Sequence, residues 1–170
     1  GKVRKTWSKV QKRAFNKSNR RRWRLLQQWW ADEMLATPSP LTERLVLFWH
    51  NHFTTSFDRV KWVPYLYKQN TVFRRHAAGN FRDLLIAMVT DPAMLFYLDG
   101  RQNQAKKPNE NFARELLELF TMGEGGGYTE RDIREVARAL SGWSVDPKSS
   151  KAVFRAKRHD PLLKEFLGQR

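Results

Sequence analysis

Hydrophobic residues recur at helical spacing in the first part of the chain. Between residues 22 and 35 the apolar positions fall three or four residues apart: Trp23, Leu26, Trp30 and Met34. This period predicts an amphipathic helix, and the Thr37-Pro38 pair ends it because proline restricts the residue before it. The spacing upstream predicts a shorter basic helix, which breaks near residues 16–19.

Three further helices are predicted between residues 40 and 79. Ser39 and Pro40 begin the first, over about 40–54, because serine caps helices and proline is favoured in their first turn. Its apolar stripe is formed by Leu41, Leu45, Trp49 and Phe53. The other two helices cover 61–69 and 71–79.

Capping residues mark the start of the next two helices. Asn80 precedes the first, and Asp83 lies three residues later in a box-like position. Asp91 and Pro92 open a second, short helix that continues to about residue 98. The polar stretch over 99–108 predicts a loop.

The clearest helix is predicted over 110–122, after a cap at Asn109 and before Gly123. At about 100° per residue its apolar side chains share one half of the helix. That half holds Phe112, Ala113, Leu116, Leu117, Leu119 and Phe120. The other half is polar and holds Glu110, Asn111, Arg114, Glu115 and Glu118.

The last part of the chain is predicted to be less regular. Three glycines over 125–127 form a turn, and Thr129 with Asp132 makes a second capping box for a helix that continues to Gly142. Residues 152–154 then predict a short strand and 162–167 a final turn.

The pattern as a whole predicts an all-α protein. We find no repeats and no alternation of strands with helices, so we expect a compact multi-helix domain of seven to eight helices with an irregular C-terminal segment. We divide it into a basic N-terminal arm or helix over 1–21 and a single helical domain over 22–170. Because the chain has no initiator Met, we expect a fragment of a longer protein.

Composition narrows the class of protein. Apolar residues make up 41% of the chain and charged residues 29%, which excludes a disordered tail. The longest apolar runs, 84–89 and 93–98, are too short for a transmembrane helix. With no cysteine, the chain has no disulfide, thiolate metal site or cysteine nucleophile. These features identify no cofactor and leave open whether the protein is an enzyme.

The positive charge is concentrated near the N-terminus. The net charge is +15, and residues 1–31 hold eleven basic residues and no acidic one. Such a block predicts a surface that attracts a polyanion. The alternative is a solvated helix face, or a surface that acidic groups cover in a longer chain. The residues that we expect to bind a polyanion are Lys9, Lys12, Arg13, Arg20, Arg21, Arg22 and Arg24.

The polar half of the 110–122 helix has two interpretations. Asn111, Glu115 and Glu118 form a ridge that would suit acid–base chemistry or a hard cation if it lined a cleft. The alternative is a salt-bridged face in solvent, with Glu110 and Arg114 as a favourable pair, and the spacing alone favours it.

Two histidines lie close together in the sequence but on different helix faces. His50 and His52 are about 200° apart on a helix, so one metal ion cannot bind both. His52 falls on the apolar stripe and predicts a hydrogen-bonded core histidine. His50 shares the polar side with Glu43 and Asn51, which makes it the better site candidate. No metal site follows from these spacings.

Several longer strings carry a resemblance to a known family. "LTERLVLFWHNHFTTS" at 41–56, the stretch over 79–143 that includes "PNENFARELLELF", and "HDPLLKEFLGQ" at 159–169 closely resemble the bacterial family catalogued as domain of unknown function 1800. "LLQQWWADEML" at 25–35 resembles the lead-in to its tryptophan-histidine motif. The resemblance implies a central segment of a larger secreted or periplasmic protein, and a sulfatase-like exported protein from a neighbouring gene as a partner.

The resemblance also supplies a set of polar motif residues without an established reaction. The catalytic candidates are His50, Arg114, Glu115, Glu118, His159 and Asp160. The binding candidates are Asn109, Glu110, Asn111 and Arg138. His52 belongs to the motif as well, and the three glycines before Tyr128 are where this chain departs from the family.

Three functions remain open on the sequence. The leading hypothesis is a helical domain of an exported bacterial protein with an assembly or chemical role in the envelope or outside the cell, with His50 and the Asn111/Glu115/Glu118 face near one polar cleft. The second is a basic helical module that binds nucleic acid or another polyanion. The third is metal-assisted hydrolysis that uses His50, His159 and a nearby carboxylate.

Overall fold

Eight α-helices and one short hairpin make up the described part of the chain, residues 6–146 and 148–169 of a computed structural model. The helices are α2 (Lys9–Ala36), α3 (Pro40–His52), α4 (Phe57–Val60), α5 (Val63–His76), α6 (Phe81–Val89), α7 (Pro92–Tyr97), α8 (Asn111–Glu118) and α9 (Glu130–Ala139). The strands are β1 (Trp143–Asp146) and β2 (Lys151–Phe154), and two 3₁₀ turns are η1 (Gly100–Gln102) and η2 (Ala156–Arg158). The predicted all-α class is confirmed.

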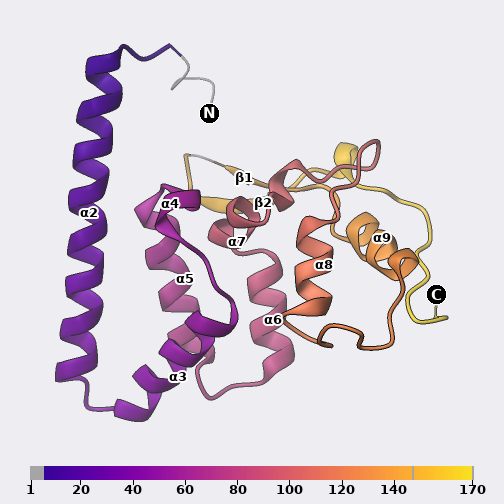
Figure 1. The fold of residues 1–170 in the computed structure, drawn as a ribbon, viewed down its shortest axis with the longest axis horizontal. Coiled ribbons are helices and arrows are strands. Elements are labelled where there is room, and N and C mark those ends of the chain that lie inside the picture. The colour runs from indigo at the N-terminus through magenta and orange to yellow at the C-terminus, as the bar shows by residue number, and fades with distance from the viewer. Residues whose placement is uncertain (1–5, 147, 170) are drawn as a thin grey trace.

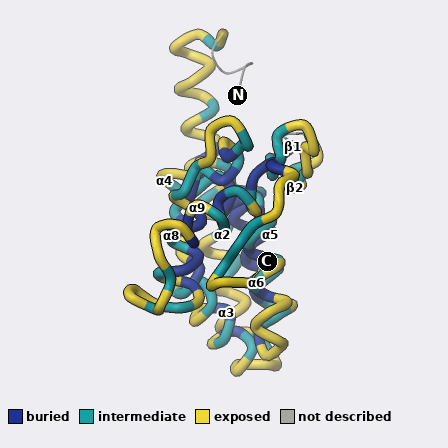
Figure 2. The backbone as a smooth tube through the Cα atoms, turned by 90° about the vertical axis from the view of Figure 1, so that its right-hand side faces the viewer, coloured by how far each residue is buried: buried dark blue, intermediate teal, exposed yellow. Residues whose placement is uncertain are grey.

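Helix α2 is one continuous helix along one side of the molecule (Figure 1). It begins with a capping box between Ser8 and Gln11, and its first turns extend beyond the other elements as mostly exposed residues (Figure 2). The predicted break near residues 16–19 is wrong. Asn19 is buried there, and its Nδ2 donates a hydrogen bond to the Lys61 carbonyl oxygen at 3.1 Å. Asparagine is a poor helix former, and this bond gives the Asn19 side chain a partner just before α5.

Helix α5 replaces the two helices that we expect over 61–69 and 71–79. The chain passes through Asn70 and Thr71 without a break, and the Thr71 hydroxyl donates to the Lys68 carbonyl oxygen at 2.7 Å. Gln69 and Asn70 are buried because α5 packs between α3 and α6 in the centre of the fold. The largest buried apolar side chains around it are Val46, Phe53, Phe73, Leu84, Met88, Met94 and Leu95.

The predicted caps at Asn80, Asp91 and Thr129 are confirmed, whereas the Ser39 side chain accepts no hydrogen bond from a backbone amide of α3 and instead pairs with the Thr42 hydroxyl. The Asn80 side chain accepts from the Arg82 amide, and the Asp91 side chain accepts from the Met94 amide. Thr129 and Asp132 form the predicted reciprocal box at the start of α9.

Helix α8 is shorter than predicted. It ends at Glu118, because the Met122 and Gly123 amides both donate to the Leu117 carbonyl oxygen and Gly123 takes a φ of 84°. Phe112 and Leu116 are buried as expected, whereas Leu119, assigned to the apolar half, is exposed.

The C-terminal part folds back over α9. Strands β1 and β2 pair antiparallel in the register Trp143↔Phe154, so the predicted strand over 152–154 is confirmed and gains a partner. Residues after η2 return to α9, where the Leu167 amide donates to the Asp132 carboxylate at 2.8 Å. In the described residues we find no helix with the length and apolar character that crossing a membrane requires.

Candidate functional site

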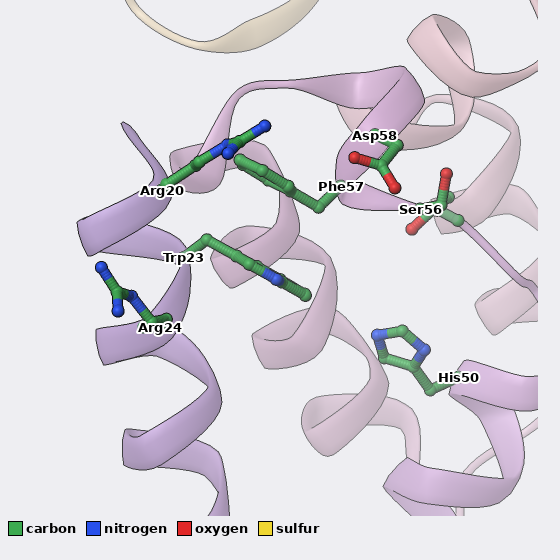
Figure 3. A pocket seen from close by; sticks show the side chains of 8 residues that line it. Arg20, Trp23, Arg24, His50, Ser56, Phe57 and Asp58 are labelled. Atoms are coloured by element: carbon green, nitrogen blue, oxygen red, sulfur yellow. The ribbon is translucent and has the colours of Figure 1, made fainter. Parts of the chain in front are cut away.

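A hollow lies between α2 and the loop that connects α3 to α4, and we call it the α2 groove. It has a volume of about 720 Å³. Arg20, Trp23 and Arg24 of α2 line one side of it, and His50, Ser56, Phe57 and Asp58 line the other. Figure 3 shows Arg20 and Trp23 directed from α2 toward this other side. Cationic, hydroxyl, aromatic and carboxylate groups therefore face one open space.

A smaller hollow of about 330 Å³, the inner pocket, adjoins the α2 groove. Trp23 and His50 line both spaces. The remaining lining residues of the inner pocket are Leu26, Gln27, Trp30, Leu66 and Asn70. The His50 ring stacks on the Trp30 indole with ring centroids 5.0 Å apart. The walls are thus aromatic and aliphatic, with an imidazole and two amides as polar groups.

Burial sets the charge state of His50. Desolvation lowers the pKa of His50 below its usual range, and a hydrogen bond with its own backbone opposes this only in part. The imidazole is therefore neutral at pH 7, and it can donate with one ring nitrogen and accept with the other.

The predicted polyanion-binding residues all lie on α2 and are exposed. Over the described part of the chain, none of the seven forms an ion pair with an acidic side chain. The two acidic residues of α2, Asp32 and Glu33, lie near its other end. Lys9 to Arg24 consequently form an uncompensated cationic surface, which we call the α2 basic face.

A separate hollow of about 570 Å³, the α8 cleft, lies where α8 meets the ends of α3 and α7. It is lined by Asn51, His52, Thr54, Arg59, Tyr97, Leu98, Asn111, Glu115, Leu119 and Phe120. His52 Nε2 lies 3.0 Å from the Phe120 carbonyl oxygen, so the prediction of a hydrogen-bonded His52 is confirmed. The Glu115 carboxylate has no hydrogen bond or ion pair with the described residues.

The structure divides the predicted polar ridge between two places. Glu115 and Asn111 line the α8 cleft, whereas Glu118 lies 3.3 Å from Arg114, which also binds Glu130 at 2.7 Å. The pair with Glu130 joins α8 to α9, and the pair with Glu118 lies within α8. His50 lines the α2 groove instead of the α8 cleft, so the expected cleft shared by His50 and the α8 ridge is absent from the described residues.

The remaining predicted residues lie elsewhere. Asn109 and Glu110 line another hollow beside the loop after η1, and the Asn109 side chain accepts from the Asn111 amide at 3.0 Å. His159 Nδ1 lies 2.8 Å from the Ser141 carbonyl oxygen. His50 and His159 share no pocket, and no three His, Asp and Glu side chains of the described residues are placed to hold a metal ion.

Arg138 and Asp160 attach the C-terminal segment to α9. Arg138 Nε donates to the Asp160 carboxylate at 2.8 Å and Nη1 to Glu135 at 2.6 Å. The Arg138 guanidinium lowers the pKa of Asp160 to about 2. Arg138 and Asp160 therefore connect α9 to the C-terminal segment, and neither residue lines the α2 groove or the α8 cleft.

Replacing Asp160 with Asn weakens this attachment. The ion pair with Arg138 is removed, so we expect faster amide hydrogen exchange over residues 160–169, with α5 unchanged. In the unaltered protein the same protection is complete above about pH 4, where the unfolded carboxyl ionises, and is lost as the pH falls through about 2. Exposed Lys157→Gln serves as the control. Unchanged amide hydrogen exchange in Asp160→Asn would contradict the role of Asp160 in attaching the C-terminal segment to α9.

Comparisons with known proteins give a family but no relative. A family model described as "Protein of unknown function (DUF1800)" matches residues 2–170. The comparisons with curated proteins and with solved structures found no significant match.

Proposed function

Because this chain belongs to the DUF1800 family, whose description gives no activity, we propose a function from its surface: the domain binds a polyanion along the α2 basic face. The observation that carries the proposal is the set of seven exposed cationic side chains on α2 that form no ion pair with an acidic side chain of the described residues.

The physical basis is electrostatic. The basic face extends from Lys9 to Arg24, which is about 24 Å along the helix, so it presents charge over a distance that covers several phosphates or sulfates. Cationic side chains that neutralise a polyanion release its bound counterions, which makes the affinity strong at low salt and steeply salt-dependent. Lysine and arginine in a surface ion-pair network would lose this advantage, because acidic neighbours already neutralise them.

The alternative is a merely solvated helix face. Two features favour binding over that alternative. Arg20 and Arg24 line a groove with Trp23 and Ser56, so the positive charge continues into a concave space. Residues 32–170 carry 21 basic and 17 acidic residues, so most of the excess positive charge lies within residues 1–31.

Neutralising the basic face reduces polyanion binding. We expect the variant Lys12→Gln/Arg13→Gln/Arg21→Gln/Arg22→Gln to elute from heparin at markedly lower salt. In nucleic-acid binding, the slope of log affinity against log salt becomes shallower by about 0.9 for each phosphate that the variant no longer neutralises. Glutamine keeps helix propensity close to that of lysine and arginine. Elution and salt titration of binding measure the effect.

A matched control removes the same charge elsewhere. Arg75→Gln/Lys106→Gln/Lys107→Gln/Arg134→Gln neutralises four exposed cations outside α2. We expect this variant to bind almost as the unaltered protein does. Equal weakening by both variants would show that net charge, and not the α2 basic face, governs binding.

Other functions stay predictions from the family resemblance. These are export of a longer parent protein to the periplasm or outside the cell, a role in the envelope, and a sulfatase-like partner. A chemical role for His50 with Asn111, Glu115 and Glu118 stays a prediction as well, although His50 lines the α2 groove and not the α8 cleft. Metal-assisted hydrolysis stays a prediction without a supporting contact between His50 and His159.

A further inference from the structure

The inner pocket offers an aromatic surface beside the α2 basic face. One face of the Trp23 indole stacks on Phe57, with centroids 5.1 Å apart and planes 6° apart. Figure 3 shows this indole below Phe57 and directed toward His50. Because Trp23 lines both the groove and the inner pocket, a flat ring that enters from the groove meets an aromatic wall.

An unpartnered polar side chain lies in the wall of the same pocket. Asn70 is 3% exposed, and its Oδ1 atom has no hydrogen-bond partner in the described residues. A buried acceptor without a partner destabilises the folded protein unless a bound molecule supplies a donor. Asn70 lines the inner pocket together with the amide of Gln27 and the neutral His50.

The lining distinguishes between two kinds of polyanion. A sugar ring can also place an apolar C–H face on an aromatic ring, but it carries a hydroxyl or sulfate group on almost every carbon of its rim. Each of these groups buried against Leu26, Leu66 or Trp30 would lose its hydrogen bonds to water. A nucleobase has apolar faces and polar groups only at its edge, so it suits aromatic and aliphatic walls with a few amides.

We propose that the inner pocket binds a base of a single-stranded nucleic acid, with the neighbouring phosphates on Arg20 and Arg24. The base stacks in the space bounded by Trp23, Trp30 and His50, and an N–H group at its edge donates to Asn70. Asp58 lies across the groove from α2, which leaves the phosphates to the α2 side (Figure 3). This inference rests on the proposed function, since it names the polyanion.

The test compares two oligomers with the same phosphates. Binding of the unaltered protein to a thymidine oligonucleotide of about twelve nucleotides and to an abasic strand of equal length is measured by fluorescence anisotropy. Base stacking makes the thymidine strand bind more tightly by about tenfold. Tryptophan fluorescence is quenched by the thymidine strand alone.

Variants locate the effect. Trp23→Leu and Asn70→Leu bring the affinity for the thymidine strand down to that for the abasic strand, while heparin elution stays unchanged. Trp29→Leu is the control, because Trp29 lies on the same helix but contacts Tyr67 and Arg74 and lines neither hollow.

The outcomes separate this inference from the proposed function. Equal affinity of the unaltered protein for both strands overturns the base pocket and leaves polyanion binding intact, and this comparison needs no variant to fold. A base preference that survives in both Trp23→Leu and Asn70→Leu also overturns it. Failure to bind heparin and both strands overturns both proposals.

Discussion

Replacing Glu43 with alanine lowers the free energy of unfolding by about 2–3 kcal/mol, because it removes the acceptor of a partly buried ion pair whose arginine side chain is 25% exposed. Glu43 is 4% exposed and accepts two hydrogen bonds from Arg74, at 2.6 and 3.0 Å. It also accepts one from Trp30 Nε1 at 3.1 Å. These bonds join α3 to α5 and to α2, so the variant leaves a guanidinium and an indole N–H without their acceptor.

Denaturant unfolding at neutral pH measures this loss. Asp32→Ala, an exposed acidic residue of α2, is the matched control and changes stability by less than about 0.5 kcal/mol. The double variant Glu43→Leu/Arg74→Leu recovers most of the stability, because apolar side chains replace both charges. If Glu43→Ala lowered the free energy of unfolding by less than about 1 kcal/mol, Glu43 would not be an important connection between α3, α2 and α5.

Replacing Asp91 with asparagine removes a pH-dependent destabilisation of the fold. Asp91 is buried at the start of α7, where its Oδ1 atom accepts from the Met94 amide at 2.9 Å and from Gln69 Nε2 at 3.0 Å. Burial raises the pKa of Asp91 to about 7, although these hydrogen bonds oppose the shift. Asparagine keeps an acceptor for the cap and carries no charge.

The raised pKa of Asp91 determines how the stability of the fold changes with pH. The carboxyl ionises near pH 4 in the unfolded chain but near 7 in the folded one, so its contribution to stability is complete below about pH 4 and decreases until about pH 7. The decrease is at most about 4 kcal/mol. Asp91→Asn therefore gains stability over the unaltered protein as the pH rises through this range.

Urea unfolding at about pH 4.5, 6 and 7.5 follows the difference between the two proteins. Exposed Asp83→Asn, near the start of α6, is the control and shows no such trend. A stability difference between Asp91→Asn and the unaltered protein that stays constant with pH would contradict the assignment.

Local relations in the sequence predict the helices well. The caps at Asn80, Asp91 and Thr129 depend on backbone amides two or three residues away, and all three are confirmed. The predicted break in α2 is wrong because the residue that decides it has a partner far away in the sequence. Asn19 is satisfied by the carbonyl of Lys61, 42 residues later along the chain, and no local pattern contains that partner.

The candidate site is predictable only in part for the same reason. The helical rotation between His50 and His52 correctly places them in different surroundings. Which one meets Glu115 depends on how α8 packs against α3, and the sequence gives no rule for that. Glu43, expected on the polar side with His50, is buried because Arg74 of α5 and Trp30 of α2 converge on it.

The hydrogen bond from Trp30 to Glu43 has a consequence for recognition. Trp30 is the ring on which His50 stacks, and its Nε1 atom is held by the same carboxylate that joins the central helices. The side-chain entropy of this wall is therefore already lost when the chain folds. A ligand that binds there meets a pre-organised surface and need not immobilise it, which favours slow dissociation.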